Sequence, residues 1–193
     1  MPRVKLFDEK TVLEKAMCLF WKKGYYATSV QDLVNHLGIN RASLYDTYGG
    51  KKQLFKKAFS HYQNTNVQLL QQFLDQQENT RAGLQTMFAQ AIQESQTDKD
   101  RRGCFVVNTT IEFIPNEIEM LAVLKAHQQR FEQIFFNYLA KGVERGDLPP
   151  GKDLKAIAAL LFTYYNGLRV ITKVTIDPEL QLQSINSLLS VLD

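Results

Sequence analysis

Apolar residues recur along almost the whole chain at the three- and four-residue spacing of an amphipathic helix. This pattern predicts an all-α protein. The expected helices span about residues 8–23, 29–37, 40–48, 51–78, 80–95, 104–114, 117–145, 154–175 and a last segment that starts near Pro178. The run CFVVNTTIEF at 104–113 is rich in residues that favour strands, but no second run of this kind can pair with it. A buried helix is therefore the better interpretation.

Residues suited to helix ends mark the first short helices. Ser29 and Asp32 have the spacing of a capping box, and Asn40 is a good N-cap for the helix that follows it. Gly24 and Gly38 have the residue type that ends a helix. Two short helices joined by a turn with a glycine form the helix-turn-helix pattern, in which the second helix enters the major groove of DNA.

Later helices carry similar signals. Thr80 and Asp153 are the expected N-caps of the helices that follow them. Pro115 is expected to end the helix at 104–114, and Asn116 is a candidate cap for the next one. These signals divide the rest of the chain into long helices.

The second helix of the helix-turn-helix pair carries more polar side chains than a small core accepts. Arg41 can reach guanine O6 and N7 with its two-pronged guanidinium. Asn40 and Ser43 can bond to bases or phosphates, and Tyr45 and Thr47 offer hydroxyls to phosphates. We expect this helix to contact DNA.

Further phosphate contacts are expected at two neighbouring helix starts. Lys51 lies in the first turn of the next long helix, whose free N–H groups can hold a phosphate with it. Thr28 and Ser29 can act in the same way at the start of the preceding helix. In the alternative interpretation Tyr45 and Tyr48 pack in the core of the head and Arg41 is only solvated. We favour packing for Tyr48 and contact with DNA for the others.

Charge is unevenly distributed along the chain. Residues 1–60 contain eleven Lys and Arg against five Asp and Glu, which is a net charge of +6, whereas the remainder carries −3 of the total +3. Such an asymmetry indicates a head that binds a polyanion, attached to a nearly neutral body. A solvated helical face is the alternative that charge alone leaves open.

The run TSVQDLVNHLGINRASLYDTYGGKKQLF, at 28–55, resembles the DNA-binding signature of the TetR/AcrR family of transcriptional regulators. The match lies in the ordered series Leu44-Tyr45, Tyr48, Gly49-Gly50 and Lys51. The resemblance implies that base and phosphate contacts fall on Thr28, Asn40, Arg41, Ser43, Tyr45, Asp46, Thr47 and Lys51.

The sequence departs from the family pattern at three of these positions and at Tyr48. Asn40 replaces the usual Ser and Tyr48 the usual Phe, while Asp46 and Thr47 stand where aromatic or His residues are common. A phosphate would repel Asp46, which can instead accept a hydrogen bond from a cytosine N4 amine.

The resemblance implies a DNA-binding domain over 1–50 and a helical effector-binding and dimerisation domain over 51–193. The helix at 154–175 supports this independently, because it is apolar on more faces than the core of one monomer requires. With the helix at 117–145 it would form half of a four-helix bundle across a two-fold axis. Paired heads would then meet half-sites about one DNA turn apart.

Aromatic residues of the body are candidates for an effector pocket, although such residues more often form core. The candidates are Met87, Phe88, Cys104, Phe105, Asn108, Phe113, Phe131, Phe135, Tyr164 and Tyr165. A buried Asn108 would need a partner, either Glu112 or a ligand. An apolar pocket suits a small lipophilic or aromatic effector, whereas Arg81, Arg101 and Arg102 leave an anionic one open.

Other classes of protein find little support. The three histidines lie on different segments without metal-ligand spacing, and there is no Gly-rich phosphate loop, so no metal, cofactor or enzymatic activity is expected. No signal peptide and no membrane span is expected, and Cys18 and Cys104 are interpreted as buried free thiols of a cytoplasmic protein.

The expected function is therefore that of a ligand-responsive regulator of transcription. We expect a repressor that binds a palindromic operator as a homodimer and is released by a small-molecule effector. A helical protein-interaction module without DNA binding is the alternative.

Overall fold

The computed structural model describes residues 7–114, 117–174 and 177–193. Its helices are α1 (Glu9–Lys23), α2 (Val30–Leu37), α3 (Arg41–Tyr48), α4 (Lys51–Asp75), α5 (Thr80–Thr97), α6 (Phe105–Phe113), α7 (Ile118–Arg145), α8 (Leu154–Ile171) and α9 (Pro178–Leu189), followed by a 3-10 turn at Ser190–Leu192. The all-α prediction is confirmed, as is the choice of a helix for α6. The signals predicted at Pro115 and Asn116 lie outside the described residues, and α8 ends before the predicted residue 175.

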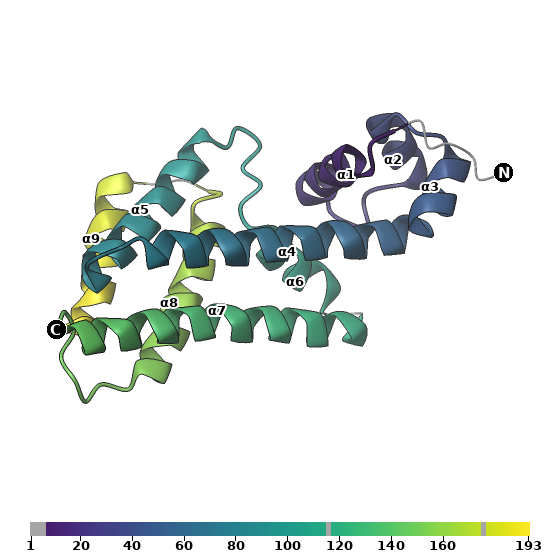
Figure 1. Cartoon of the computed structure of the whole chain (residues 1–193). Coiled ribbons are helices and arrows are strands. Elements are labelled where there is room, and N and C mark those ends of the chain that lie inside the picture. The colour runs from purple at the N-terminus through teal and green to yellow at the C-terminus, as the bar shows by residue number, and fades with distance from the viewer. Residues whose placement is uncertain (1–6, 115–116, 175–176) are drawn as a thin grey trace.

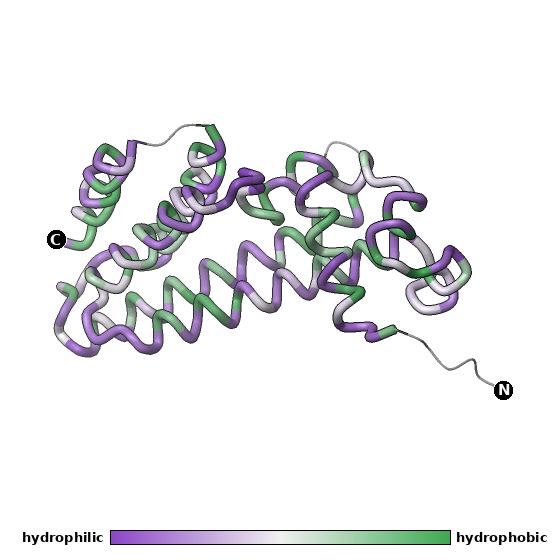
Figure 2. Tube along the Cα trace, turned by 90° about the horizontal axis from the view of Figure 1, so that it is seen from above, coloured by the Kyte–Doolittle hydropathy of each residue, from purple (hydrophilic) through white to green (hydrophobic). Residues whose placement is uncertain are grey.

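Helix α4 runs along most of the molecule and carries a different group of helices at each end (Figure 1). Helices α1 to α3 form a head at its N-terminal end, while α5, α8 and α9 gather at the other end beside the C-terminus. Helix α7 runs alongside α4 and packs on α8. Most helices change from hydrophilic to hydrophobic every few residues (Figure 2), as amphipathic helices do.

The helix caps follow the sequence with one exception. The predicted capping box of Ser29 and Asp32 is present, and Asp153 caps α8. The N-cap of α5 is Asn79, whose side chain accepts a hydrogen bond from the Ala82 amide, and not Thr80 as predicted. Thr80 is buried, and its own N–H donates to Asp147 at 2.6 Å. Asparagine, one residue earlier, is at least as good a cap.

Two hydrophobic clusters build the interior. One joins α1 to α3 with the first half of α4, with α6 and with the start of α7, and Phe55 lies at its centre. The other fills the body between α5, α7, α8 and α9. The head therefore shares its core with part of the body. The domain boundary at residue 50 stays a prediction.

Some apolar side chains of the C-terminal helices are left uncovered. Leu160, Val170 and Ile171 of α8 are exposed, as are Leu180 and Leu182 of α9. Such a face on two long helices is a candidate surface for association. None of the described helices is both long and apolar enough to cross a membrane.

The two cysteines lie in different environments. Cys104 is buried, as predicted, but Cys18 is exposed, so that part of the prediction is wrong. The buried residues of α1 are Val12, Ala16 and Phe20. Position 18 is two residues from the last two of these, which turns its side chain to the opposite side of the helix.

Candidate nucleic-acid interface

Helix α3 is fixed to the head by one face and presents the other to solvent. Leu44 and Tyr48, four residues apart, are buried in the core of the head, which confirms that Tyr48 packs. The Tyr48 hydroxyl donates to the Glu9 carbonyl at 3.2 Å. Arg41 and Tyr45 lie on a neighbouring face of α3, beside this buried pair, and are exposed to solvent.

The turn at residues 38–40 fixes the orientation of α3 on the head. Gly38 has φ 68°, a left-handed conformation that ends α2, and the Asn40 side chain accepts from the Ser43 amide at 2.8 Å to begin α3. Ile39 between them is buried and anchors the turn. Asn40 is thus occupied as a cap, although its residue remains exposed.

A continuous strip of side chains connects α3 to the start of α4. The guanidinium carbon of Arg41 lies 5.9 Å from the centre of the Tyr45 ring. A Cβ atom at Gly50 would lie 3.0 Å from Cε1 of that ring, so glycine lets the ring lie close to the backbone. Gly50 also has φ 103°, a conformation that other residues rarely adopt. The polar end of Tyr45 is thereby held at the surface.

The start of α4 has the features of an anion site. Gly50 precedes it and provides no side-chain cap, so the first N–H groups of α4 have no side-chain acceptor. Lys51 is half-buried, with its Nζ atom 4.2 Å from the centre of the Tyr25 ring. Burial lowers the pKa of Lys51, and the carboxylates of Glu112 and Asp32 oppose that shift.

The two residues predicted to contact phosphate at the start of α2, Thr28 and Ser29, lie in different environments. The Thr28 side chain is buried, its hydroxyl donates to the Gly24 carbonyl at 2.5 Å, and its N–H donates to the Tyr25 carbonyl. Ser29 is exposed, and its hydroxyl bonds to Asp32 at 2.7 Å. A hydrogen bond from Lys23, followed by those from Ser29, lowers the pKa of Asp32. The N–H and the hydroxyl of Thr28 are therefore both used within the protein, and its phosphate contact stays a prediction.

The remaining two positions of α3 are placed but not assigned a role. Thr47 is half-buried at the edge of the helix. Asp46 is exposed and forms no hydrogen bond or ion pair within 7–114, 117–174 and 177–193. Contacts of either residue with DNA stay predictions.

Glu112 of α6 joins the body to the head and was missed from the sequence. Its carboxylate accepts hydrogen bonds from the amides of Tyr25 at 3.0 Å and Tyr26 at 2.7 Å. The sequence instead predicts either Glu112 or a ligand as the partner of Asn108. Asn108 in fact donates to the Arg102 carbonyl at 2.8 Å and accepts from Lys173 at 3.1 Å. The two residues are one helical turn apart, but they bond to different segments.

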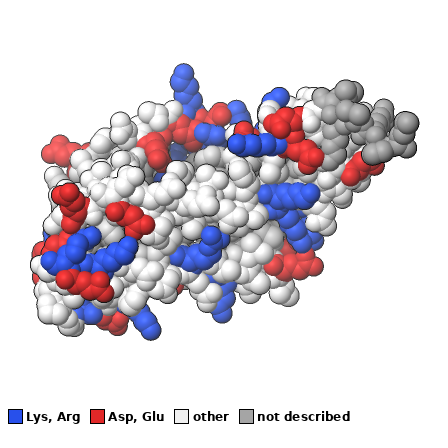
Figure 3. All heavy atoms as spheres, in the orientation of Figure 1, with Lys and Arg blue, Asp and Glu red and all other residues white. Residues whose placement is uncertain are grey.

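Ion pairs strengthen the same junction. Lys52 lies 3.1 Å from Glu117, and Lys56 lies 3.2 Å from Glu119. Figure 3 shows this face, with basic side chains on α4 above acidic ones at the nearby end of α7. Exposed pairs of this kind each contribute little to stability, typically about 0–1 kcal/mol.

Most of the predicted pocket residues serve in packing. Met87 and Tyr165 line a hollow of about 300 Å³ between α4, α5 and α8. Five of the candidates are buried in the core, namely Phe88, Phe105, Phe113, Phe131 and Phe135. Cys104 lies beside the Tyr62 hydroxyl, and the Tyr164 hydroxyl bonds to Ser184. An effector pocket among these residues stays a prediction. No group of His, Cys, Asp and Glu in the described ranges is arranged to hold a metal ion.

Comparison with known proteins decides what this head and body are. Residues 12–58 match the family described as bacterial regulatory proteins, tetR family, and residues 57–187 match the tetracyclin repressor-like C-terminal domain. The chain belongs to the TetR family. TetR-family proteins are DNA-binding regulators of transcription, so the exposed face of α3 belongs to a helix-turn-helix head.

Individual members of the TetR family resemble the chain over most or all of its length. The uncharacterized HTH-type transcriptional regulator YezE of Bacillus subtilis is 32% identical, with 100% of each chain covered. The HTH-type transcriptional repressor ComR of Escherichia coli is 31% identical, over 87% of this chain and 80% of that protein. A solved structure of the TetR-family regulator CifR with 26-bp operator DNA has a TM-score of 0.87 at 27% identity and covers 99% of this chain and 100% of that one.

Proposed function

We propose that the protein is a cytoplasmic, homodimeric repressor that binds a palindromic operator and is released by a small-molecule effector. The observation that carries the proposal is the strip of Arg41, Tyr45 and the uncapped start of α4 on one side of the head. A guanidinium for base edges beside donors for phosphate is the combination that reads and grips DNA. The resemblance to ComR, a repressor by its name, supports the direction of regulation.

The uncovered apolar face of α8 and α9 supports a dimer. Exposed Leu160, Ile171 and Leu180 would be removed from water by a second copy. A two-fold axis there would place two heads on one DNA duplex, as a palindromic operator requires.

Replacing Arg41 with alanine should relax base specificity. We expect the preference for one base pair in each half-site to fall by about 1–3 kcal/mol, since a guanidinium bound to guanine is lost. Fluorescence anisotropy with operator variants changed at single positions measures this preference. An equal loss of affinity for every sequence would contradict a base contact by Arg41.

Replacing Lys51 with alanine should weaken binding to all DNA sequences by the same factor. The lost phosphate contact lowers the salt dependence of binding by about one unit of slope. Binding to one fragment over a series of salt concentrations measures the slope. Lys155 is an exposed lysine of α8, and Lys155→Ala, a matched control, should leave the slope unchanged.

A gel shift with the DNA beside the protein's own gene tests the whole proposal. A salt-sensitive shift with one fragment is expected, with a stoichiometry of one dimer per operator. If no promoter fragment gave a shift, the head would be better explained as part of a protein-interaction module.

A further inference from the structure

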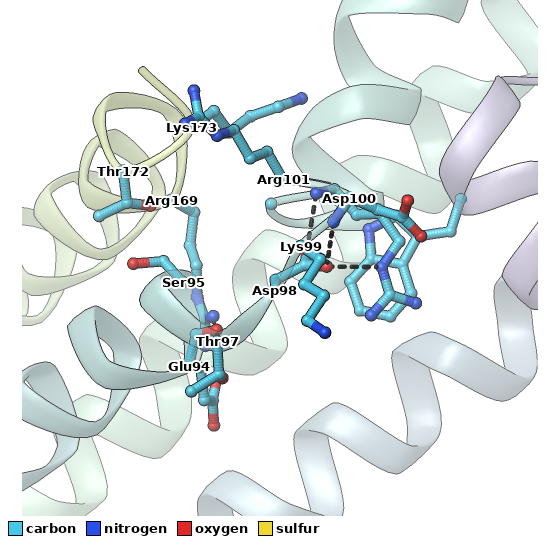
Figure 4. Close-up of a pocket in the computed structure, with 13 residues that line it drawn as sticks. Glu94, Ser95, Thr97, Asp98, Lys99, Asp100, Arg101, Arg169, Thr172 and Lys173 are labelled. Atoms are coloured by element: carbon cyan, nitrogen blue, oxygen red, sulfur yellow. Dashed lines mark hydrogen bonds and ion pairs between the residues drawn. The ribbon is translucent and has the colours of Figure 1, made fainter. Parts of the chain in front are cut away.

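A cavity of about 490 Å³ lies where the head meets the body. Trp21 of α1 lines it on the side of the head, together with the loop 98–103. The end of α5, with Glu94, and the end of α8, with Arg169 and Lys173, line it on the side of the body (Figure 4). This volume falls in the range of small-molecule sites. The cavity is separate from the aromatic core in which a pocket was predicted.

The lining of the cavity is positively charged. It contains five cationic side chains and three carboxylates, for a net charge of +2. Two of the cations are neutralised, since Arg102 pairs with Asp98 at 3.2 Å and Arg169 with Glu94 at 2.8 Å.

The other three cations of the lining lack a carboxylate partner. Lys173 bonds to the neutral Asn108, and Arg101 bonds to the Val174 carbonyl at 3.3 Å. Lys99 has no partner among the described residues. Three uncompensated cations around one cavity favour a ligand with more than one negative charge.

Two residues of the lining also carry polar atoms that are left unsatisfied. The Thr172 hydroxyl and the indole N–H of Trp21 are buried and have no hydrogen-bond partner within the described part of the chain. The Thr172 residue is only 6% exposed. An unsatisfied buried group of this kind costs about 1–3 kcal/mol. Both groups can donate to oxygen atoms, so a bound oxyanion would satisfy them.

We propose that this cavity binds a small organic polyanion, carrying two or more carboxylate or phosphate groups, and that binding alters how the head is held against the body. The first part of the proposal needs no DNA. The second part, regulation of operator affinity, rests on the proposed function.

Direct contacts connect the cavity to the head. Lys22 of α1 pairs with Asp100 of the loop at 2.7 Å, and the Arg102 guanidinium lies 4.3 Å from the centre of the Trp21 ring. Asn108 bonds to both the loop and the end of α8. A polyanion that draws the loop toward Lys173 would therefore move the partners of α1. Since α1 packs on α4 and α2, the position of α3 would change with it.

Trp21 is the only tryptophan of the chain, so its fluorescence reports directly on this cavity. The full-length protein is titrated with citrate, succinate, pyrophosphate and inorganic phosphate, with ionic strength held constant by sodium chloride. Calorimetry measures the same titrations independently. We expect a saturable response, and the comparison of carboxylates with phosphates identifies the class of anion. No saturable response to any of the four anions would overturn the proposal.

The double variant Lys99→Gln/Arg101→Gln tests which residues bind the anion. Its affinity should fall at least about tenfold, because two charged contacts are lost. Lys155→Gln removes one exposed charge from α8 outside the cavity and should bind as the wild type does. Equal affinity of the double variant and the wild type would refute the site.

Operator binding with and without the anion tests the coupling. We expect the anion to weaken operator binding of the wild type by about 5–150-fold, and operator DNA to weaken anion binding by the same factor. Without anion, the double variant should bind the operator normally, and a loss there would show that Lys99 and Arg101 contact DNA instead. Anion binding that leaves operator affinity unchanged would overturn the coupling. If the wild type bound no operator, the proposed function would fail, while the fluorescence titration would still decide the site.

Discussion

Replacing Phe55 with alanine is expected to lower the free energy of unfolding by about 3–5 kcal/mol. Phe55 is only 1% exposed and lies at the point where three parts of the chain meet. Its ring centre is 5.2 Å from that of Phe20 in the head and 5.0 Å from that of Phe113 in α6. Removal of the ring leaves a cavity between the head and α6. Neither of them can move to fill this cavity without losing its contacts with the other.

Urea unfolding at a fixed protein concentration measures this loss. Phe136 is half-buried in the other cluster, and Phe136→Ala, a matched control, should cost clearly less. A loss below about 1 kcal/mol for Phe55→Ala would contradict a shared core between head and body.

Acidification should destabilise the protein through His127. This residue is 6% exposed, and its Nδ1 atom has no partner in the described structure. Burial, assisted by the charge of Arg130, lowers the pKa of His127 from 6.5 to about 4. The unfolded chain therefore takes up this proton first as pH falls, and the folded state loses stability between pH 6.5 and about 4. At about 1.4 kcal/mol per pH unit, the full effect is on the order of 3 kcal/mol.

Comparison with His127→Leu isolates this effect from that of the carboxylates, which titrate in both proteins. We expect wild type to lose about 2–3 kcal/mol more stability than the variant between pH 7.5 and pH 4.5. Urea unfolding at both pH values gives the two differences. Parallel losses in the two proteins would show that His127 is protonated equally well when folded and unfolded.

The order of helices was predictable because periodicity and caps are local properties. The capping box at Ser29, the glycine after α2 and the N-cap at Asn40 all depend on residues within one turn of each other. The exposed face of α3 was predictable for the same reason, because Leu44 and Tyr48 are four residues apart. The contacts of this face with DNA need a partner molecule and stay predictions.

The junction between head and body could not be predicted, because its contacts join residues far apart in the chain. Glu112 bonds to amides 86 and 87 positions earlier, and Lys22 pairs with Asp100, 78 positions later. No local spacing signals such pairs. Asn108 shows the same limit, since a need for a partner was evident but the choice of Arg102 and Lys173 was not. Arg101 and Arg102 left an anionic effector open, but the cavity that they line at this junction was missed for that reason.

The unbroken course of α4 makes the head sensitive to small movements of the body. A helix of 25 residues is about 37 Å long, because each residue adds about 1.5 Å. A tilt of about 5° at the body end would therefore displace the other end by about 3 Å. This displacement is close to the rise between successive nucleotides of one DNA strand, which is about 3.4 Å. In the proposed homodimer the two displacements would combine, so a slight rearrangement would put both heads out of register with the half-sites of the proposed operator.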